Sequence, residues 1–355
     1  MNCERIAIIG RLAKDSALLD GQTVKTKILY EELCRRFPNT DVVCVDTYLY
    51  RKRMIPLFFQ MLGAFIRCKH IFVLLSRNGR TFLFPFLTSL NRLFRRRLYH
   101  DVIGGALATE AKERPALCRQ LRRFEVNWVE LPQMKTDLEA LGVYNAEVLP
   151  NFKRLHILQE DALSSPHEPP FVFTMFSRVI KEKGIGAAME AVNTVNEACG
   201  TQKALLRIYG PVEPKYQEEF HELLSRFGHC AQYMGCIPQD ESVNALQGSY
   251  MLLFPSVYPG EGMPGTVIDA FSAGLPIIAT DWHFNAELVH HGINGYCYDW
   301  TRPELLAHWI RYAVDNPEEI NRMRPACLAE AAKYTPEAAM QQILRKMEET
   351  QENPA

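Results

Sequence analysis

Two carboxylates with seven residues between them, Glu261 and Asp269, have the spacing that most directly suggests chemistry in this chain. Glu261 lies among glycines and prolines, where the backbone can approach a ligand closely. Asp269 lies about one turn inside a helix that we predict over 266–273, capped by Thr266. Because a carboxylate accepts several hydrogen bonds at once, the two acids predict a site for sugar-like hydroxyls. On residue types alone, a helix-dipole role for Asp269 and a solvated loop position for Glu261 fit equally well.

The elements around these acids predict an anion site beside them. Apolar runs at 250–254 and 276–280 have the length of buried strands, and residues 256–265 form a loop rich in glycine and proline. A strand–loop–helix–strand unit is the building block of a parallel sheet, whose ligands bind outside the carboxyl ends of the strands. The first amides of a helix lack internal partners, so Gly265 and Thr266 are expected to add positive potential near a phosphate.

The length of the chain and the order of its elements predict two α/β domains. A chain of 355 residues is long enough for two hydrophobic cores. Apolar runs of strand length alternate with helical segments, as in doubly wound parallel sheets, although the Gly-x-Gly-x-x-Gly fingerprint of dinucleotide binding is absent. Residues 159–170 are rich in proline and serine, which is typical of a linker. We therefore predict domains at 1–155 and 171–335, joined by a linker at 156–170.

Composition favours a cytoplasmic protein without a metal site. Hydrophobic residues make up 47% of the chain and charged residues 23%, as in ordinary globular proteins. The ten cysteines include no Cys-x-x-Cys pair and no zinc-ligand spacing, so we interpret them as reduced thiols. No apolar run has the length of a membrane span, and the N-terminus lacks a signal-peptide pattern.

Charge is unevenly distributed along the chain. The formal net charge is −1, yet residues 1–150 hold 24 Lys and Arg against 15 Asp and Glu. The segments 51–69 and 81–97 mix bulky apolar residues with flanking cations, a composition typical of interfacial helices on anionic lipid. Core helices with solvated charged ends fit these segments at least equally well. No nucleic-acid-binding motif accompanies the cations, so we predict no nucleic-acid partner.

The stretch 261–276 resembles the Glu-x7-Glu signature of the family 4 glycosyltransferases, the retaining, nucleotide-sugar-dependent enzymes also described as glycosyl transferases group 1. The matching residues are Glu-Gly-Met-Pro at 261–264, Asp-Ala at 269–270 and Ala-Gly-Leu-Pro at 273–276. Asp269 stands where the family has the longer Glu. The resemblance implies the GT-B architecture, in which two Rossmann-like doubly wound domains face each other across a cleft. It also implies that a last helix, 336–352, packs back on the N-terminal, acceptor-side domain.

The resemblance extends to the start of the second, nucleotide-sugar-binding domain. Arg178, at a predicted strand end, and Lys183, five residues on, match the family's residues that hold the nucleotide diphosphate. Fixed cations neutralise the charge that grows on a diphosphate leaving group without a metal ion. On residue types alone, a solvated basic turn is the alternative. Within the resemblance, Asp269 holds the ribose hydroxyls and Glu261 the hydroxyls of the donor sugar.

In the first domain the resemblance rests on two residues. Gly21 lies in the loop predicted after the first strand, which in the family lies under the donor, although a plain turn glycine fits equally well. His100 ends a predicted strand and is followed by two glycines at 104–105, so its side chain can point into a cleft. An isolated histidine is more often structural. Because the family often places a histidine here, we predict that His100 contacts the donor sugar.

Together these patterns predict a retaining glycosyltransferase with Glu261 and His100 as catalytic residues. The donor would be a UDP- or GDP-sugar, bound without a cofactor or metal. The acceptor would be a glycan or lipid-linked glycan of bacterial surface or capsular polysaccharide synthesis, met by a cytoplasmic enzyme in peripheral contact with the inner face of the cytoplasmic membrane. Two alternatives stay open: a sugar-nucleotide epimerase or phosphorylase of the same architecture, and a catalytically silent partner subunit that binds a nucleotide sugar.

Overall fold

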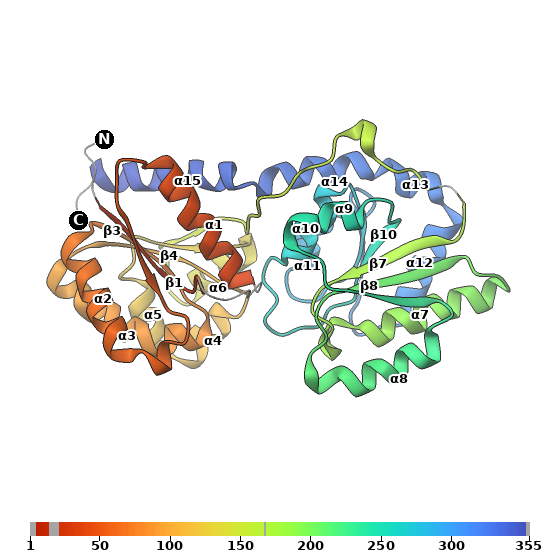
Figure 1. Ribbon diagram of the computed structural model, residues 1–355, viewed down its shortest axis with the longest axis horizontal. Helices are drawn as coiled ribbons and strands as arrows, with labels where there is room; N and C mark the ends of the chain where they lie inside the picture. Colours follow the sequence, from red (N-terminus) through yellow and green to blue (C-terminus); the bar gives the residue numbers. More distant parts are fainter. Residues whose placement is uncertain (1–4, 14–20, 167, 353–355) are drawn as a thin grey trace. The chain divides into compact units, whose positions relative to one another are not determined.

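The computed structural model of the protein describes residues 5–13, 21–166 and 168–352. The chain divides into two compact units, Met1–Lys153 with Thr335–Ala355 (unit 1) and Arg154–Tyr334 (unit 2). Each unit is built around its own six-stranded parallel sheet with helices on both faces (Figure 1). The fold is therefore the predicted α/β class with two doubly wound sheets.

The sheet of unit 1 has the strand order β2-β1-β3-β4-β5-β6, and its neighbouring strands run parallel. The strands are rich in β-branched and aromatic residues, and β1, which reads Ile-Ala-Ile-Ile-Gly, is buried throughout. The chain order reverses between β1 and β3, so the carboxyl ends of these strands are a natural position for a ligand. The strands are β1 (Ile6–Gly10), β2 (Val42–Asp46), β3 (His70–Leu74), β4 (Arg97–Asp101), β5 (Val126–Val129) and β6 (Ala146–Val148).

Two groups of helices cover this sheet. On one face α1 lies beside α15, and Leu29 of α1 and Ile343 of α15 join the core formed by the strands (Figure 1). On the other face α2 packs against α3, and α4 against α5. The last helix of the chain thus completes the core of unit 1. The helices are α1 (Gly21–Arg36), η1 (Tyr50–Lys52), α2 (Met54–Arg67), α3 (Arg77–Phe94), α4 (Leu107–Glu113), α5 (Pro115–Leu121), α6 (Pro132–Ala140) and α15 (Pro336–Glu352).

The sheet of unit 2 has the order β12-β11-β10-β7-β8-β9, again with parallel neighbours. Counted from β7, this is the strand order of a dinucleotide-binding Rossmann sheet, and the chain order reverses between β7 and β10. The carboxyl ends of these two strands are therefore where a ligand is expected. The strands are β7 (Phe171–Phe176), β8 (Ala204–Tyr209), β9 (Ala231–Gly235), β10 (Met251–Phe254), β11 (Ile277–Thr280) and β12 (Gly295–Tyr298).

Helices sandwich this second sheet as well. On one face α7 packs against α12 and α8, and on the other α10 packs against α9 and α14 (Figure 1). The helical elements are η2 (Glu160–Ala162), η3 (Lys181–Lys183), α7 (Ile185–Cys199), η4 (Pro214–Tyr216), α8 (Gln217–Phe227), η5 (Gln239–Glu241), α9 (Ser242–Leu246), α10 (Gly265–Ser272), α11 (Asn285–Leu288), α12 (Leu305–Asp315), α13 (Pro317–Arg322), α14 (Arg324–Ala331) and η6 (Ala332–Tyr334).

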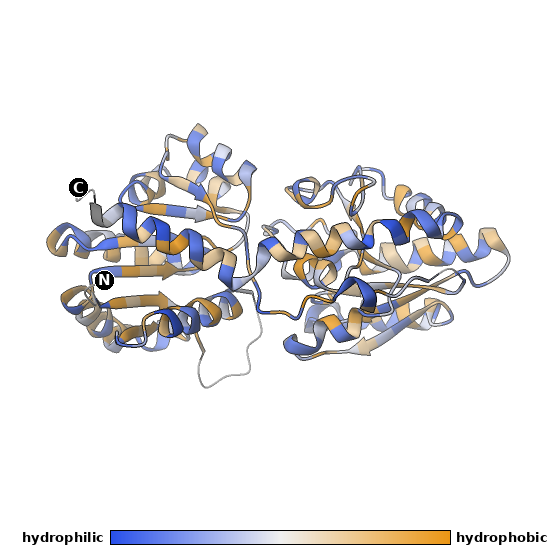
Figure 2. Cartoon of the chain, turned by 90° about the horizontal axis from the view of Figure 1, so that it is seen from above, coloured by the Kyte–Doolittle hydropathy of each residue, from blue (hydrophilic) through white to orange (hydrophobic). Residues whose placement is uncertain are grey.

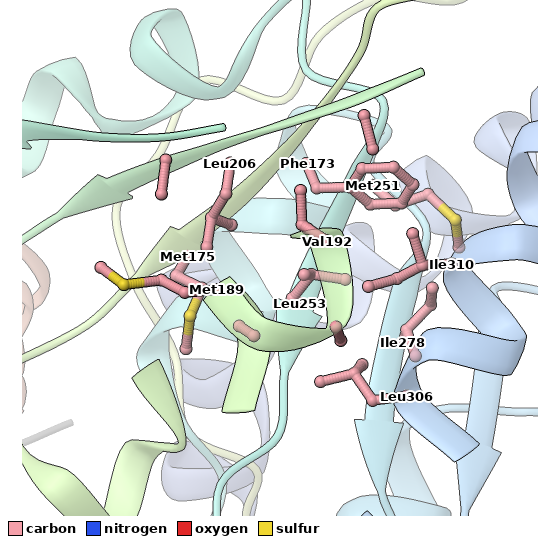
Figure 3. Close-up of a cluster of buried hydrophobic side chains, with 14 of the residues drawn as sticks. Phe173, Met175, Met189, Val192, Leu206, Met251, Leu253, Ile278, Leu306 and Ile310 are labelled. Atoms are coloured by element: carbon pink, nitrogen blue, oxygen red, sulfur yellow. The ribbon is translucent and has the colours of Figure 1, made fainter. Parts of the chain in front are cut away.

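The core of unit 2 lies between its sheet and the layer formed by α7 and α12. Figure 3 shows side chains of the strands packed against those of the helices, with Leu253 facing Val192 of α7 and Ile310 of α12. Along the helices of both units hydrophobic and hydrophilic residues alternate, whereas the strands are largely hydrophobic (Figure 2). None of the helices in the described ranges is both long and apolar enough to span a membrane.

The segment predicted as a linker, 156–170, packs on unit 2. The amide of Leu158 donates a hydrogen bond to the carbonyl of Ser272, at the end of α10. Leu163 lies so close to Gly274 that a Cβ at that position would come within 2.2 Å of its side chain. Proline and serine therefore mark an irregular segment here, but the apolar residues among them bind it to the unit.

Candidate functional site

The strand order of unit 2 brings the predicted site residues of two distant segments together. Arg178 and Lys183 follow β7, and Glu261 follows β10, which is the neighbour of β7 in the sheet. Parallel strands end at the same edge of a sheet, so both segments leave the sheet at the point where the chain order reverses. The polar side chains therefore gather where this topology places a ligand.

Lys183 and Glu261 form a buried ion pair at this edge. The Lys183 Nζ lies 2.5 Å from the Glu261 Oε2, and the Ser256 hydroxyl donates a 2.7 Å hydrogen bond to the same carboxylate oxygen. The Lys183 ammonium also lies 5.1 Å from the ring centroid of Phe254 and 5.4 Å from that of Tyr258. Burial lowers the pKa of Lys183, and Glu261 opposes part of that shift. The site thus holds a desolvated cation whose partner is an acid.

Tyr258 joins the two cations of the site, and the sequence did not single it out. Its ring lies below the exposed guanidinium of Arg178, at 5.3 Å, as well as beside Lys183. The Trp282 indole donates a 3.0 Å hydrogen bond to the Tyr258 carbonyl, which fixes the loop after β10. Tyr258 and Ser256 stand in the loop that the sequence marked as irregular, but their contacts depend on the neighbouring strand.

A glycine allows the turn that carries Lys183 to reach the end of β10. Gly184 has φ 73°, a left-handed conformation that favours glycine. A Cβ at this position would lie 2.5 Å from the carbonyl oxygen of Pro255. Any other residue would push η3 away from β10 and lengthen the contact between Lys183 and Glu261.

The helix after Glu261 begins one residue earlier than predicted, and Thr266 does not cap it. α10 starts at Gly265 with Pro264 in the capping position and no side-chain capping bond. Thr266 therefore lies inside the first turn, and its buried hydroxyl finds no hydrogen-bond partner within the described residues. The amides of Gly265 and Thr266 have no partner within the helix, because they precede its first internal hydrogen bond. The contact of these two amides with a phosphate stays a prediction.

Asp269 lies inside α10 and is buried. Its Oδ1 accepts a 2.8 Å hydrogen bond from the hydroxyl of Ser242, the first residue of α9. The carboxylate therefore braces α9 against α10. Its contact with a ribose stays a prediction.

His100 is fully buried in unit 1 and not at its surface, and its contact with a donor sugar stays a prediction. The side chain is fully buried in β4, with its ring 4.9 Å from that of Phe84 and 5.4 Å from that of Phe124. Its Nδ1 shares a 2.9 Å hydrogen bond with the Asn127 Oδ1. Burial lowers the pKa of His100 to about 3, so the imidazole is neutral. His100 is thus a core residue of unit 1 in this structure.

Gly21 is also placed differently from its prediction. It is the exposed first residue of α1, whereas we predicted it inside the loop after the first strand. A Cβ at Gly21 would meet no atom within 4 Å among the described residues, so the structure gives no steric reason for glycine there. Residues 14–20 of the predicted loop lie outside the described ranges.

A second buried ionic cluster, in unit 1, was not predicted. The Lys25 Nζ lies 2.6 Å from Asp101 and 3.5 Å from Glu130, and all three side chains are buried. Burial lowers the pKa of Lys25, but the two acids outweigh it and the net shift is upward. The acids end β4 and follow β5, which are neighbours in the sheet. The cluster therefore ties α1 to the carboxyl edge of the sheet.

A cavity of about 330 Å³ opens at the carboxyl ends of β1, β2 and β3 in unit 1. This is the point where the chain order of that sheet reverses. Its wall contains two cations, several hydroxyls and no acid. The lining residues are Arg11, Gln22, Thr47, Tyr48, Leu49, Tyr50, Lys52, Leu75, Ser76 and Gly79. Within the described ranges no three His, Cys, Asp or Glu side chains group closely enough to hold a metal ion.

Comparison with solved structures defines the class of this fold. HepE of Anabaena, solved in complex with UDP, has a TM-score of 0.72 at 16% identity over 97% of this chain and 100% of that one. A glycosyltransferase of Rickettsia africae has a TM-score of 0.73 at 13% identity, covering 99% of this chain and 100% of that one. The two doubly wound units thus have the GT-B fold of glycosyltransferases.

Sequence similarity to known proteins is concentrated in unit 2. The family model described as Glycosyl transferases group 1 matches residues 159–327, a little under half of the chain. The amylovoran biosynthesis glycosyltransferase AmsK of Erwinia amylovora is 25% identical over 156 residues, which are 43% of this chain and 36% of that protein. A sucrose synthase of Melioribacter roseus is 26% identical over 171 residues, 43% of this chain and 21% of that protein. The matches therefore span about a third or less of these relatives.

Proposed function

We propose that this protein is a retaining glycosyltransferase that moves a hexosyl-type sugar from a UDP- or GDP-sugar to a hydroxyl group. The observation that carries the proposal is the Lys183–Glu261 pair, which places a cation for phosphate and an acid for sugar hydroxyls 2.5 Å apart at the carboxyl edge of β7 and β10. The family of residues 159–327 and the likeness to structures holding UDP support the same reading.

Donor binding exchanges the partners within this site. The diphosphate takes the place of Glu261 beside Lys183, and Arg178 adds a second cation. Glu261 then accepts hydrogen bonds from the sugar hydroxyls, and Asp269 from the ribose. As the bond between the sugar and the diphosphate breaks, the negative charge on the leaving oxygen is stabilised by Lys183, Arg178 and the amides at the start of α10.

The acceptor attacks on the same face of the sugar. Its hydroxyl oxygen bonds to the anomeric carbon as the bond to the diphosphate breaks, and the leaving phosphate oxygen takes the hydroxyl proton. Configuration is thus retained, and the step needs no general base from the protein. It also needs no metal or cofactor, because fixed cations carry the charge of the leaving group. Full activity in the presence of EDTA is expected.

The acceptor in this proposal is a lipid-linked glycan of bacterial surface polysaccharide synthesis. Support comes from AmsK, which is named for the biosynthesis of a polysaccharide. The cavity in unit 1, with Arg11, Lys52 and the tyrosine hydroxyls in its wall, suits a polar glycan that carries negative charge. Nucleotide sugars are cytoplasmic and lipid-linked glycans are confined to the membrane, so we place the enzyme at the inner face of the cytoplasmic membrane.

A panel of nucleotide sugars tests the proposal. Each is first examined for a rise in melting temperature, and the binders are then incubated with a bacterial membrane extract while the released nucleoside diphosphate is measured. At least one UDP- or GDP-sugar is expected to bind, and the extract is expected to stimulate release in the native protein but not in Lys183→Ala. Phosphate-dependent breakdown of a glycan would indicate a phosphorylase, and the absence of binding to every nucleotide sugar would overturn the proposal.

A further inference from the structure

A long segment of unit 1 contains no acidic residue. Residues 47–100 include eleven Lys and Arg but no Asp or Glu, although the whole chain has a formal net charge of −1. The segment includes α2 and α3, which lie side by side on one face of the sheet (Figure 1). An anionic partner would therefore meet no acid along the whole of this segment.

The outer sides of α2 and α3 expose large apolar side chains. On α2, Ile55, Phe59 and Ile66 follow helical spacing and are exposed by 74%, 63% and 55%. On α3, Phe82 and Leu93 are exposed in the same way, and Leu93 is 77% exposed. The inner sides of both helices already supply the core, through buried residues such as Phe65 and Phe84. The exposed residues are thus not needed to form the core of unit 1.

Aromatic contacts join the two helices into one surface. The rings of Phe58 on α2 and Phe86 on α3 lie 4.9 Å apart, and Tyr50 lies 6.1 Å from Phe82. We call the surface formed by Tyr50, Ile55, Phe58, Phe59, Ile66, Phe82, Phe86 and Leu93 the α2/α3 face. Two ring contacts bridge its two sides, whereas a scatter of single exposed residues would need no explanation.

Cations stand at the ends of this face. Lys52 and Arg53 precede α2, Arg67 ends it, and Arg92 and Arg95 lie at the end of α3, all of them exposed. None of these five side chains forms an ion pair within the described residues. Arg96 instead donates hydrogen bonds to the carbonyls of Phe65 and Ile66 and so ties the end of α2 to the chain after α3.

We propose that the α2/α3 face binds the surface of an anionic phospholipid bilayer, with its apolar side chains at the acyl boundary and its cations on the headgroup phosphates. Apolar side chains flanked by cations are what such a surface attracts. A second copy of the chain would bring cations against cations, and a nucleic acid would leave the exposed Ile, Leu and Phe side chains without an apolar partner. This inference rests on the proposed function and deepens it, because a lipid-linked acceptor lies in the same bilayer surface that the α2/α3 face would bind.

Sedimentation with vesicles tests this proposal on the full chain without a nucleotide sugar. Vesicles of phosphatidylglycerol and phosphatidylethanolamine are compared with vesicles of phosphatidylcholine, at low and at 1 M salt. Binding to the anionic vesicles is expected, with a large loss at 1 M salt, where screening reduces the Debye length to about 3 Å. Because no donor is present, this measurement and the test of transferase activity can fail independently.

Matched variants locate the contact. Ile55→Ser/Phe59→Ser is expected to lower binding about tenfold or more, while Tyr144→Ser, which removes an equally exposed ring elsewhere on unit 1, leaves binding unchanged. Arg53→Gln/Arg67→Gln is likewise expected to lower binding about tenfold or more. Its control, Lys215→Gln/Arg322→Gln, removes the same charge from unit 2 and should have no effect. Melting temperatures verify that each variant folds.

Three results would overturn the proposal. The first is an absence of binding to anionic vesicles at low salt. The second is binding that the face variants leave unchanged although they fold. The third is occupation by another partner, seen either as a dimer of the native chain that Ile55→Ser/Phe59→Ser converts to a monomer, or as tight binding of an oligonucleotide by a protein that ignores vesicles.

Discussion

Lys183 and Glu261 lie 78 positions apart in the chain, yet their charged groups lie 2.5 Å apart at the edge of one sheet. The first belongs to the turn after β7 and the second to the loop after β10, and these strands are neighbours because the chain order reverses between them. Each group is held by the other, so a donor that binds here has to separate them. Substitutions of Lys183 and of Glu261 should therefore have different effects on donor binding.

Replacing Lys183 by Ala is expected to weaken UDP binding by tenfold to about a hundredfold, the range for one charge-assisted hydrogen bond. The same change leaves the Glu261 carboxylate buried without its cation and should lower the free energy of unfolding by about 3–5 kcal/mol. Titration calorimetry and urea unfolding measure the two effects. The double variant Lys183→Ala/Glu261→Gln should regain part of the stability but none of the affinity. Unchanged UDP affinity in Lys183→Ala would reject its role.

Replacing Glu261 by Gln is expected to separate binding from transfer. Gln keeps the shape of the side chain and can still accept a hydrogen bond from Ser256, but it no longer competes with phosphate for Lys183. UDP should therefore bind at least as tightly as to the native protein, whereas sugar transfer should fall by more than a hundredfold. Calorimetry with UDP and release of UDP from the sugar donor give the two values. Native transfer by this variant would contradict the proposed contact with the sugar.

Replacing Arg178 by Gln should weaken binding of UDP more than binding of UMP. The Arg178 guanidinium is exposed above Tyr258 and is therefore free to reach a second phosphate. Lys181, in the same turn, supplies a matched control because its ammonium pairs with Glu219 on the surface. Lys181→Gln should leave both affinities within twofold, since exposed pairs contribute about 1 kcal/mol or less. If Arg178→Gln and Lys181→Gln changed the affinities equally, Arg178 would be a solvated turn residue that does not contact the diphosphate.

Asp269 can be tested for the ribose contact and for its structural contact separately. Ser242→Ala removes the hydroxyl that Asp269 binds in the structure and should cost about 1 kcal/mol of stability without changing nucleotide affinity. Asp269→Ala should lower both the stability and the nucleotide affinity. UDP and its 2′,3′-dideoxy analogue differ only in the ribose hydroxyls, so the native protein should prefer UDP and Asp269→Ala should not. A preference that survives in Asp269→Ala would leave the residue with its bracing role alone.

His100 predicts a pH dependence of stability in unit 1. Burial lowers its pKa to about 3, whereas an unfolded histidine titrates near 6.5. Between these values the unfolded chain binds a proton that the folded chain does not. The free energy of unfolding should therefore fall as the pH drops from about 6.5 toward 3, by up to about 1.4 kcal/mol per pH unit from this group, and be unaffected above 6.5.

The variant His100→Gln isolates that contribution. Gln can still bind the Asn127 side chain but does not titrate, so urea unfolding between pH 4 and 8 should show a flatter curve than the native protein. The two curves are expected to run parallel above pH 6.5 and to converge below it. Parallel curves over the whole range would mean that His100 reaches solvent in the folded state.

Patterns within one continuous segment were sufficient to single out several residues of the candidate site. Glu261 could be singled out because glycine and proline surround it directly after a strand, and Arg178 and Lys183 because they match the motif of the family that the chain resembles. Thr266 was misplaced because α10 begins without a side-chain cap. Helix ends without caps depend on packing, which short windows of sequence do not contain.

Contacts between strands could not be predicted in the same way. Tyr258 lies between two cations and Lys25 between two acids, and each contact joins segments that strand order alone brings together. His100 shows the converse: its place at a strand end indicated a cleft, but Phe84 of α3 and Phe124 cover its ring. A sequence pattern can predict where a strand ends, but it does not predict which side chains from other segments cover that end.

By itself the sequence determined two doubly wound α/β units, the resemblance to nucleotide-sugar-dependent transferases, and the acids and cations of unit 2. These follow from periodicity and from motifs that are continuous in the chain. Only the tertiary structure decided that Lys183 and Glu261 share a buried contact, that His100 lies in a core, and that α2 and α3 expose one cation-flanked apolar surface. The physical reason is that burial and pairing depend on which strands and helices become neighbours, and residues far apart in the chain set that order.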